Sequence, residues 1–570
     1  MTMKKNHFSL FTLLLLATAI MTACSDMLST ESEVVEFEEN NTLNNPTDSM
    51  YNVMGIVNKI QSIADRVVLL GEVRGDLVVT TEEASADLKQ LASFDLEKSN
   101  KYCRISDYYA VINNCNYIIA HLDTALARRG KKVFEKEYAA AKGFRAWTYL
   151  QLVLNYGKVP LVTEPVMTEN QAEITVNGDY KGIEEICNFF IDDIKDYANV
   201  KTPDYGNVGE NNKHHSQEFF IPMRALLGDL CLWAGRYREA ASWYHDYLSD
   251  KDYPILPNIT NYVRWRSITE YKTPSDLYSV NDDYEVLSYI PMETRIFDGT
   301  VSDLYNVFCS TTENKRYYQV TPSRNMRALS AKQIYCQEYH NTNSIDTIYV
   351  PRTGLLDSIY LGDLRLSSNY RMSSLGGQNK YSEYNTDYQT IFKINRGAII
   401  TYRRTIVWLR YAEALCRAGF PQSAFCILKY GLCNENALSY IDEEERTAAA
   451  GLIEFNETWF MRNSTMGIHS AGSGDSQCNK YYTLPMPTSE LATRQDTIDW
   501  QIPLVEDYII NEMALEGSFE GYRFFDLMRV ALRRNDPAYL ALPISCRNKE
   551  KDEALYEKLM NTDNWYLPLK

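Results

Sequence analysis

Two segments of this chain repeat one spacing of small and apolar residues, and that spacing restricts the fold more than any other feature. The repeated positions are Leu227, Gly228, Cys231, Gly235, Ala240 and Tyr244 in the first segment, and Ala412, Leu415, Gly419, Ala424 and Leu428 in the second. The small residues let two paired helices approach closely, and Gly235 and Gly419 turn the chain between the helices. Each segment is therefore predicted to form a helix–turn–helix pair.

The spacing matches a tetratricopeptide repeat, a unit that cannot bury its apolar face alone. Such units stack into a solenoid, so neighbouring helix pairs are expected, with two unrelated hairpins as the alternative. Asn45 and Pro46 predict a helix start, with asparagine as the cap and proline at the first helical position. Apolar periodicity predicts further helices over 106–122, 133–155, 180–197, 221–233, 237–248, 401–417, 421–432 and 505–515. The expected fold class is mainly α, a tetratricopeptide-like helical-repeat scaffold with an irregular, loop-rich insertion.

The N-terminal residues have the pattern of a bacterial lipoprotein signal. Two lysines precede an almost unbroken apolar run, Phe8–Ile20, and small residues lead into Cys24. The 16 residues from Phe8 to Ala23 are fewer than the roughly 20 that a transmembrane helix needs. A secretory signal with a coincidental cysteine is the other alternative. We expect residues 1–23 to be removed and Cys24 to be lipidated, which anchors the protein to a membrane outside the cytoplasm.

The rest of the sequence divides by composition and periodicity. Residues 24–45 are acidic and are predicted to form a flexible tether. The body, residues 46–570, is expected to comprise an N-terminal helical part (46–249), an aromatic-rich insertion (250–400) and a C-terminal helical part (401–570).

The charge balance excludes some partners. Lys and Arg number 58 and Asp and Glu number 75, a formal net charge of −17 that becomes −19 when the signal and its two lysines are removed. A surface of this sign repels nucleic acid and anionic lipid, so neither is an expected partner.

Cysteine and histidine give no indication of a metal site. Without Cys24 eleven cysteines remain, an odd number that cannot all pair, and no Cys-x-x-Cys or zinc-ligand spacing occurs. Cys231, Cys416 and Cys426 lie in apolar helical patterns and are predicted to be buried thiols. His214 and His215 follow polar residues and are predicted to lie in an exposed loop. No cofactor is expected.

Several further segments occur in one order along the chain. They are 73–76 (VRGD), 144–146 (FRA), 155–162 (NYGKVPLV), 223–227 (MRALL), 409–414 (LRYAEA), 519–529 (FEGYRFFDLMR) and 565–568 (WYLP). In content and order they resemble segments of SusD/RagB-type nutrient-uptake lipoproteins of Bacteroidetes. The resemblance runs from Cys24 to the last residues and covers essentially the whole mature chain.

The resemblance implies a binding protein and not an enzyme. Family members sit on the outer surface as lids over a SusC-like TonB-dependent transporter and capture oligosaccharides, or sometimes peptides. We therefore expect a lipid-anchored protein of the outer membrane, exposed at the cell surface, with an oligosaccharide ligand and such a transporter as partners.

The resemblance also implies where a ligand binds. The sugar site of the family is typically an arc of aromatic side chains, because the apolar face of a pyranose stacks on a ring while its hydroxyls need hydrogen bonds. The insertion holds 17 of the 42 tyrosines, which makes it the expected location. Trp265 between two arginines, and Tyr317 and Tyr318 after Lys315-Arg316, pair rings with donors.

Other ligand candidates lie in the N-terminal part. Many family members carry a tryptophan where this chain has Ile105, so Tyr102 and Arg104 are candidates to take over stacking. Arg74 and Asp76 are candidates for polar recognition in a loop.

Most of the arginines in the matched segments are predicted to support the scaffold. Arg145, Arg224 and Arg410 lie on otherwise apolar helix faces, where a guanidinium satisfies helix ends or carboxylates. Arg523, Asp526 and Arg529 recur three apart and are predicted to form an ionic ladder on one helix face.

Two other functional classes are alternatives. A surface glycosidase or lyase needs a carboxylic acid and a base, and carboxylates are abundant, but no Gly-x-Ser-x-Gly, His-Glu-x-x-His or phosphate-binding glycine loop occurs. A helical-repeat interaction scaffold or a peptide-binding lid is the other alternative; a pure scaffold predicts a continuous repeat array, against which the aromatic insertion argues.

Overall fold

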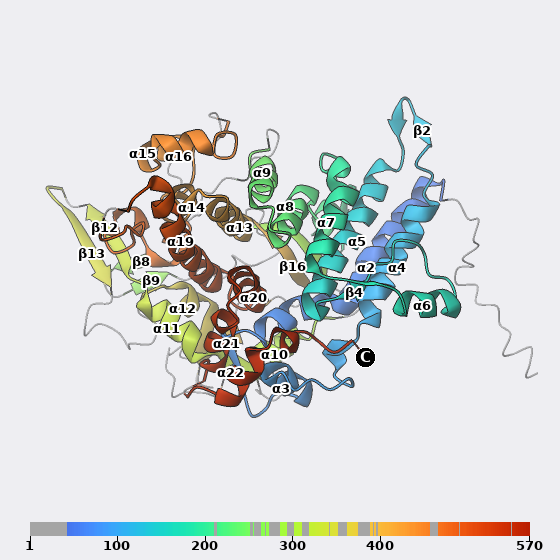
Figure 1. Cartoon of the computed structure of the whole chain (residues 1–570), viewed down its shortest axis with the longest axis horizontal. Helices are drawn as coiled ribbons and strands as arrows, with labels where there is room; N and C mark the ends of the chain where they lie inside the picture. The colour runs from blue at the N-terminus through green and yellow to red at the C-terminus, as the bar shows by residue number, and fades with distance from the viewer. Residues whose placement is uncertain are drawn as a thin grey trace, which may run out of the picture. The chain divides into compact units, whose positions relative to one another are not determined.

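The computed structural model places the predicted body in one compact unit, Asn44–Lys570 (Figure 1). The structure describes residues 43–209, 214–250, 255, 264–267, 270–272, 285–292, 301–310, 318–340, 342–350, 362–373, 388–391, 393–394, 397–456, 466–489, 491–548 and 550–569. The predicted signal, Cys24 and residues 24–42 of the predicted tether lie outside these residues and stay predictions. Among the described helices, none combines the length and the apolar character needed to cross a bilayer.

The N-terminal helices pack against one another through the faces that the sequence predicts. Helix α2 (Pro46–Glu72) begins at the expected proline and buries Val53, Val57 and Ile60. It packs against α4 (Ser106–His121) and α5 (Glu135–Tyr156), and α5 in turn contacts α7 (Ile183–Ile194).

Both predicted helix pairs are present and are stacked in one array. The first pair is α8 (Met223–Trp233) and α9 (Tyr237–Leu248); the second is α13 (Arg404–Arg417) and α14 (Pro421–Lys429). Helix α7 packs on α8, α9 packs on α13, and α13 and α14 pack on α19 (Arg494–Glu516). The mainly α, tetratricopeptide-like fold class is therefore confirmed.

Short elements complete the unit. The other α-helices are α3 (Ala86–Ser93), α6 (Glu169–Val176), α10 (Leu304–Phe308), α11 (Arg324–Lys332), α12 (Arg365–Asn369), α15 (Asn434–Tyr440), α16 (Glu443–Ala448), α18 (Ser470–Ser473), α20 (Arg523–Arg534), α21 (Ala538–Ser545) and α22 (Glu553–Leu559). Short 3-10 turns include η1 (Lys101–Cys103), η2 (Lys195–Tyr197), η4 (Ser216–Phe219), η6 (Ser476–Cys478) and η7 (Thr562–Trp565).

The described strands form antiparallel two-stranded ladders. They pair as β1 (Val78–Thr80) with β11 (Val320–Pro322), β2 (Ala127–Arg128) with β3 (Lys131–Lys132), β4 (Val159–Pro160) with β5 (Tyr180–Lys181), β6 (Asn207–Val208) with β7 (His214–His215), β8 (Arg264–Ser267) with β9 (Glu270–Lys272), β10 (Val286–Pro291) with β16 (Ala398–Arg403), β12 (Tyr335–His340) with β13 (Ile345–Val350), and β14 (Tyr370–Ser373) with β15 (Tyr388–Ile391). Half of these described strands, β8 to β15, lie within 250–400, where helical periodicity is weak.

Several helix boundaries differ from the prediction, and two of the differences have a clear cause. The segment expected to be helical from 401 begins as strand β16, which pairs with β10, and the helix starts at Arg404. The helix expected from 505 starts eleven residues earlier, at Arg494, where Thr493 and Asp496 form a capping box.

The predictions for cysteine and histidine have different outcomes. Cys231, Cys416 and Cys426 are buried free thiols, as predicted. The exposed loop is wrong for His214, which is 3% exposed and has its Nδ1 2.7 Å from the Tyr289 hydroxyl. The aromatic rings of Phe219 and Tyr289 pack beside it, so the ring is covered.

Gly228 shows why a small residue is needed inside a helix pair. A Cβ at this position would lie 2.5 Å from the ring of Tyr244, which is fully buried. The Tyr244 hydroxyl donates to Asp229 at 2.6 Å, so the ring is held in place and cannot withdraw. Gly55 on α2 is the opposite case: among the described residues, nothing beyond its chain neighbours and its own helix backbone lies within 4 Å of its would-be Cβ.

We expect alanine to have opposite effects at these two glycines. Gly228→Ala should lower the free energy of unfolding by about 1–3 kcal/mol through overpacking. Gly55→Ala should raise it by up to about 1 kcal/mol, because alanine favours an open helix position. Denaturant unfolding measures both, and equal changes in the two variants would contradict the packing described here.

Candidate functional site

An open groove lies at the start of α8, where the N-terminal helices meet the insertion. Its volume is about 690 Å³, within the range of about 300–1,000 Å³ typical of small-molecule sites. We call it the α8 groove. Its lining residues are Ala198, Asn199, Val200, Lys201, Thr202, Gln217, Glu218, Phe220, Pro222, Met223, Arg224, Tyr247, Asp250, Ile255, Val286 and Leu287.

Arg224 is fixed at the wall of the α8 groove. Its guanidinium donates to the Asp250 carboxylate at 2.9 Å, to the Asp246 carbonyl at 3.0 Å and to the Asn199 side chain at 2.8 Å. The Arg224 side chain is still 22% exposed and that of Asp250 is 32% exposed. The groove therefore presents a preorganised charged group whose position does not depend on a ligand.

Tyr247 gives the α8 groove an aromatic side chain. The residue is half-buried on α9, and burial raises the pKa of its phenol, so it stays neutral near pH 7. Ile255 is held beside it, because its N–H donates to Leu248 at 2.9 Å and its carbonyl accepts from the Trp408 indole at 3.1 Å. A neutral ring, aliphatic side chains and amide groups together suit a ligand that is partly apolar and partly hydroxylated.

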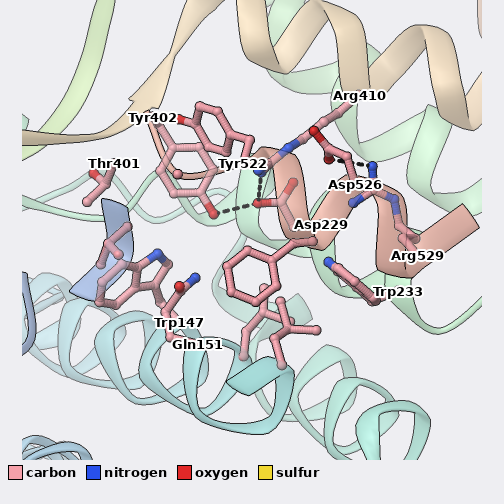
Figure 2. Close-up of a pocket in the computed structure, with 15 residues that line it drawn as sticks. Trp147, Gln151, Asp229, Trp233, Thr401, Tyr402, Arg410, Tyr522, Asp526 and Arg529 are labelled. Atoms are coloured by element: carbon pink, nitrogen blue, oxygen red, sulfur yellow. Dashed lines mark hydrogen bonds and ion pairs between the residues drawn. The ribbon is translucent and has the colours of Figure 1, made fainter. Parts of the chain in front are cut away.

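A second, internal cavity lies among α5, α8, α13 and α20 (Figure 2). Asp229 on α8 is its polar centre and accepts hydrogen bonds from Tyr244 at 2.6 Å, Tyr402 at 2.8 Å and Arg410 at 2.6 Å. The Arg410 guanidinium also lies 5.3 Å from the centre of the Tyr522 ring. With a volume of about 50 Å³ the cavity has room for a few waters and not for a sugar ring.

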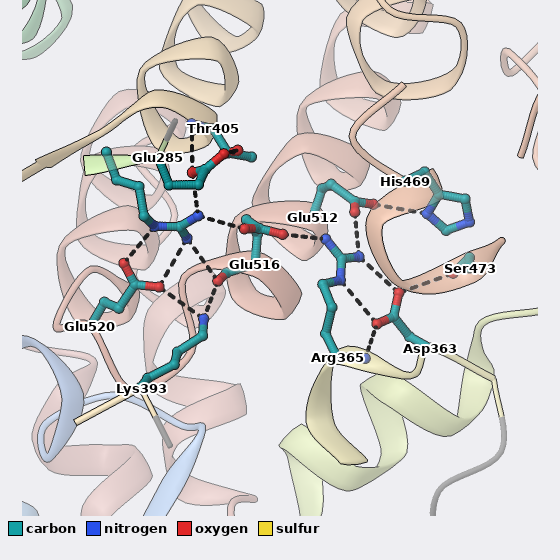
Figure 3. A network of polar contacts seen from close by, with 11 residues as sticks. Glu285, Asp363, Arg365, Lys393, Thr405, His469, Ser473, Glu512, Glu516 and Glu520 are labelled. Carbon is teal, nitrogen blue, oxygen red and sulfur yellow. Dashed lines mark hydrogen bonds and ion pairs between the residues drawn. The ribbon is translucent and has the colours of Figure 1, made fainter. Parts of the chain in front are cut away.

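A buried ionic network includes Glu285, the residue before β10 (Figure 3). Two residues of β10 line the α8 groove. Glu516 on α19 accepts from Arg365 at 2.9 Å and from Arg403 at 2.7 Å. Arg403 also contacts Glu285, the residue before β10, at 3.0 Å. The side chains of these four residues are at most 1% exposed.

The network joins the insertion to the C-terminal part. Asp363 and Glu512 contact Arg365 at 2.8 and 2.5 Å, and Glu520 contacts Lys393 at 2.8 Å. Figure 3 shows Glu512 between Arg365 and His469, whose Nδ1 lies 3.0 Å from the carboxylate. Carboxylates of α19 and of the turn after it thus hold cations that come from residues 365–403.

Several solved structures of other proteins superpose on this chain over most of its length. No family model and no curated protein matches the chain. A SusD superfamily protein from Bacteroides vulgatus superposes with a TM-score of 0.55 at 14% identity, over 93% of this chain and 96% of that one. A SusD-like carbohydrate binding protein from Bacteroides fragilis gives 0.54 at 14% identity, over 87% and 88%. A SusD superfamily protein from Bacteroides thetaiotaomicron gives 0.52 at 13% identity, over 85% and 89%.

The chain has the SusD fold. The resemblance to this family found in the sequence is therefore confirmed for the fold. The segments that carry it mostly have structural roles in this SusD fold, as the positions of their arginines show.

Arg74 and Asp76 are buried and are not placed to touch a ligand. Arg74 donates to the Leu70 carbonyl at 2.7 Å, the Trp565 carbonyl at 3.0 Å and the Asn155 side chain at 2.5 Å. Asp76 accepts from Arg523 at 2.6 Å. Their exposed fractions are 0% and 3%. The prediction of polar recognition is therefore wrong for both, because C-terminal segments cover the loop and occupy its polar groups.

The other predicted ligand-binding residues differ in how far they are exposed to solvent. Tyr102 is 6% exposed and has no free ring face for stacking, so the structure contradicts its predicted role. Arg104 has a side chain that is 64% exposed and lies 3.4 Å from Asp107, and Tyr318 is half-buried; both stay predictions. The side chain of Trp265 and the whole of Tyr317 lie outside the described residues.

The scaffold arginines bind carboxylates, as predicted. Arg145 pairs with Asp193 at 2.8 Å and Arg410 with Asp229 at 2.6 Å. On α20, Arg529 pairs with Asp526 at 2.9 Å, which confirms that part of the ladder. Arg523 instead reaches Asp76, on a segment far away in the sequence.

Sequence reasoning did not find the α8 groove. Its wall residues come from five separate segments between 198 and 287, and no local pattern links them. The available signal was Arg224, a charged residue on an apolar helix face, but that pattern does not reveal that the arginine stays partly exposed.

The ionic network predicts a large effect of one substitution. Glu516→Gln should lower the free energy of unfolding by about 3–5 kcal/mol, because two buried guanidinium groups lose a charged partner. The matched control is Glu239→Gln, which removes the 2.6 Å pair with Arg236 at 37–38% exposure and should cost at most about 1 kcal/mol. Similar losses in denaturant unfolding of both variants would contradict the role given to Glu516.

The buried carboxylate of Glu516 also makes the free energy of unfolding depend on pH. Burial raises the pKa of Glu516, but Arg403, Arg365 and Lys393 outweigh burial and lower it to about 2. A lowered pKa stabilises the fold above the unfolded value of about 4.3, and this contribution is lost as the pH falls towards about 2. Between pH 5 and pH 2, wild type should therefore lose more unfolding free energy than Glu516→Gln. Equal losses in acid titrations of stability would contradict the assignment.

Proposed function

We propose that this chain is a carbohydrate-binding protein of the SusD superfamily, which captures oligosaccharides at the cell surface and delivers them to a TonB-dependent outer-membrane transporter. The observation that carries the proposal is the shared fold: solved structures of SusD superfamily and SusD-like carbohydrate binding proteins match 85–93% of the chain at TM-scores above 0.5. The segments by which the sequence resembles this family also support the proposal.

The α8 groove supports glycan binding physically. A sugar ring presents an apolar face and a rim of hydroxyls, so it needs aliphatic or aromatic contacts together with fixed donors and acceptors. Tyr247, Met223 and Val286 offer the first kind of contact, and Arg224 and Asn199 the second. We propose that the groove forms part of the glycan site.

A neutral or weakly charged oligosaccharide is the proposed ligand. The formal net charge of −17 disfavours polyanionic glycans. Stacking and a few hydrogen bonds suggest weak binding, in the micromolar to millimolar range, or about −8 to −4 kcal/mol.

Glycan capture is tested with an array and calorimetry. A glycan and peptide array on the protein without residues 1–23 should identify neutral oligosaccharides. Tyr247→Ala and Trp265→Ala should each weaken binding about tenfold, because each removes a stacking surface. Tyr180→Ala, at a tyrosine that is 36% exposed and lies on another element, is the matched control and should leave affinity unchanged.

Other results of this experiment would favour other functions. Binding of peptides alone would favour a peptide-binding lid, and turnover of the glycan would favour an enzyme. Unchanged affinity in Tyr247→Ala, with the thermal unfolding temperature preserved, would exclude the α8 groove.

The proposed location and partner are tested together in cells. If Cys24 is lipidated, the protein should fractionate with the outer membrane and be removed from intact cells by added protease, and Cys24→Ser should release it or trap the precursor. Mild detergent extracts should yield a large TonB-dependent β-barrel with the wild-type protein, through surfaces of the α8–α9 and α13–α14 pairs. A soluble periplasmic wild-type protein would contradict the location, and recovery without a barrel in several detergents would favour an independent binder.

A further inference from the structure

The hairpin between α4 and α5 concentrates positive charge on a chain that is otherwise acidic. Its two strands and the turn between them consist of Ala127, Arg128, Arg129, Gly130, Lys131 and Lys132, all of them exposed. We call residues 127–132 the basic hairpin. Most of its residues are cationic, whereas the whole chain has a formal net charge of −17. The sign of this surface is therefore opposite to that of the protein as a whole.

The cations of the basic hairpin are not neutralised by the protein. Within the part of the chain that the structure describes, their side chains form no hydrogen bond or ion pair. The scaffold arginines differ in this respect, as Arg145 shows in its pair with Asp193. Of the nearby carboxylates, Asp123 accepts two backbone N–H groups at 3.0 and 3.1 Å, and Glu135 lies in the first turn of α5. The charge of the hairpin is therefore available to an external partner.

The fold keeps these cations together although they repel one another. Arg128 and Lys131 are directly opposite each other in the ladder, and like charges in such a pair destabilise it. Arg129 has a φ of 53°, in a two-residue turn where asparagine or glycine is usual. The base of the hairpin is fixed, because the Val133 N–H donates to the Leu126 carbonyl at 3.0 Å. An anionic partner would relieve the repulsion that the hairpin itself leaves uncompensated.

The basic hairpin lies at the end of the compact unit where the chain enters it. Helix α2 begins at Pro46, directly after the predicted tether. Near the other end of α2, Arg66 donates to the Arg104 carbonyl at 2.8 Å and to the Asp107 carboxylate, at the start of α4. The two packed helices therefore run in opposite directions, and the end of α4 that leads into the hairpin lies beside the beginning of α2. Figure 1 shows the hairpin projecting beyond these helices.

We propose that the basic hairpin binds the phosphate groups of anionic lipids in the membrane to which Cys24 anchors the chain. A lipid anchor holds a protein more firmly when a group of basic side chains adds a second contact with the same surface. The hairpin has no aromatic residue on which a sugar ring could stack, so its side chains act as point charges that suit phosphate. This inference rests on the proposed function for the anchor and adds an electrostatic contact to it.

The acidic character of the whole chain does not oppose this contact. Net charge predicts that anionic lipid is repelled by the surface as a whole. At physiological ionic strength, however, exposed charges interact over only about 8 Å. The local sign of a projecting hairpin therefore decides what it attracts, and the acidic remainder of the surface favours an orientation in which the hairpin faces the membrane.

Vesicle binding tests the inference without the lipid anchor. The protein without residues 1–23, which is not lipidated, should co-sediment with vesicles of an equal mixture of phosphatidylglycerol and phosphatidylcholine, and not with phosphatidylcholine alone. Arg128→Gln with Lys131→Gln should weaken this binding about tenfold or more, because each basic side chain near an anionic surface contributes about fivefold. High salt should weaken the binding of wild type in the same way.

A matched control separates the hairpin from the net charge. Lys98→Gln with Lys158→Gln removes the same charge at two exposed lysines, and Lys158 follows the far end of α5. This variant should bind the anionic vesicles as wild type does. Thermal unfolding should show no loss of stability in Arg128→Gln with Lys131→Gln, because a pair of like charges is removed.

Three outcomes would overturn the inference. Equal vesicle binding by wild type and the hairpin variant would exclude the hairpin, and equal weakening in both variants would show that net charge alone is responsible. Binding of wild type to immobilised dextran sulfate but not to vesicles, lost in the hairpin variant, would assign the hairpin to a polyanionic glycan. None of these measurements uses the lipid, the transporter or a captured oligosaccharide, so the proposed function stands or fails separately, in the glycan array and in cell fractionation.

Discussion

The charge network around Glu516 is the interaction on which the arrangement of this protein most depends. One carboxylate on α19 is shared by Arg365 and Arg403, whose positions in the sequence are 38 residues apart and more than a hundred residues before it. Ions buried this deeply are costly to remove from water, so the network stabilises the fold only when every partner is in place. It therefore fixes how the strands that return from the insertion meet the C-terminal helices.

Buried charged residues also bind the N-terminal part to the C-terminal end of the chain. Arg74 and Asp76 lie in a loop after α2, and their partners include Trp565 and Arg523 near the other end of the chain. Helix–helix contacts alone leave a repeat array open at its ends. In this chain, buried arginines such as Arg74 and Arg523 join segments near the two ends of the body to the helical array. Arg403 in turn holds Glu285, the residue before β10, and β10 lines the α8 groove.

Whether an element could be predicted from the sequence depends on how far apart along the chain its stabilising partners lie. Helices were predictable because periodicity, caps and glycine turns act within a few residues: the pairs at Gly228 and Ala412 are where the spacing places them. The capping box at Thr493 is also local and could have been read from the sequence. The segment from 401 was expected to be helical, but its first residues belong to strand β16. This strand was not predictable, because it forms through pairing with β10, about a hundred residues away.

The sequence by itself determined the helical-repeat class, the paired helices, the lipoprotein-like start and the resemblance that proved correct in fold. Tertiary structure alone decided which polar residues face solvent. Arg74 and Arg224 both lie in segments matched to the family, yet one is fully buried between backbone carbonyls and the other remains partly exposed at a groove. A residue type states which hydrogen bonds a side chain is able to make, and only the folded chain determines which partners reach it.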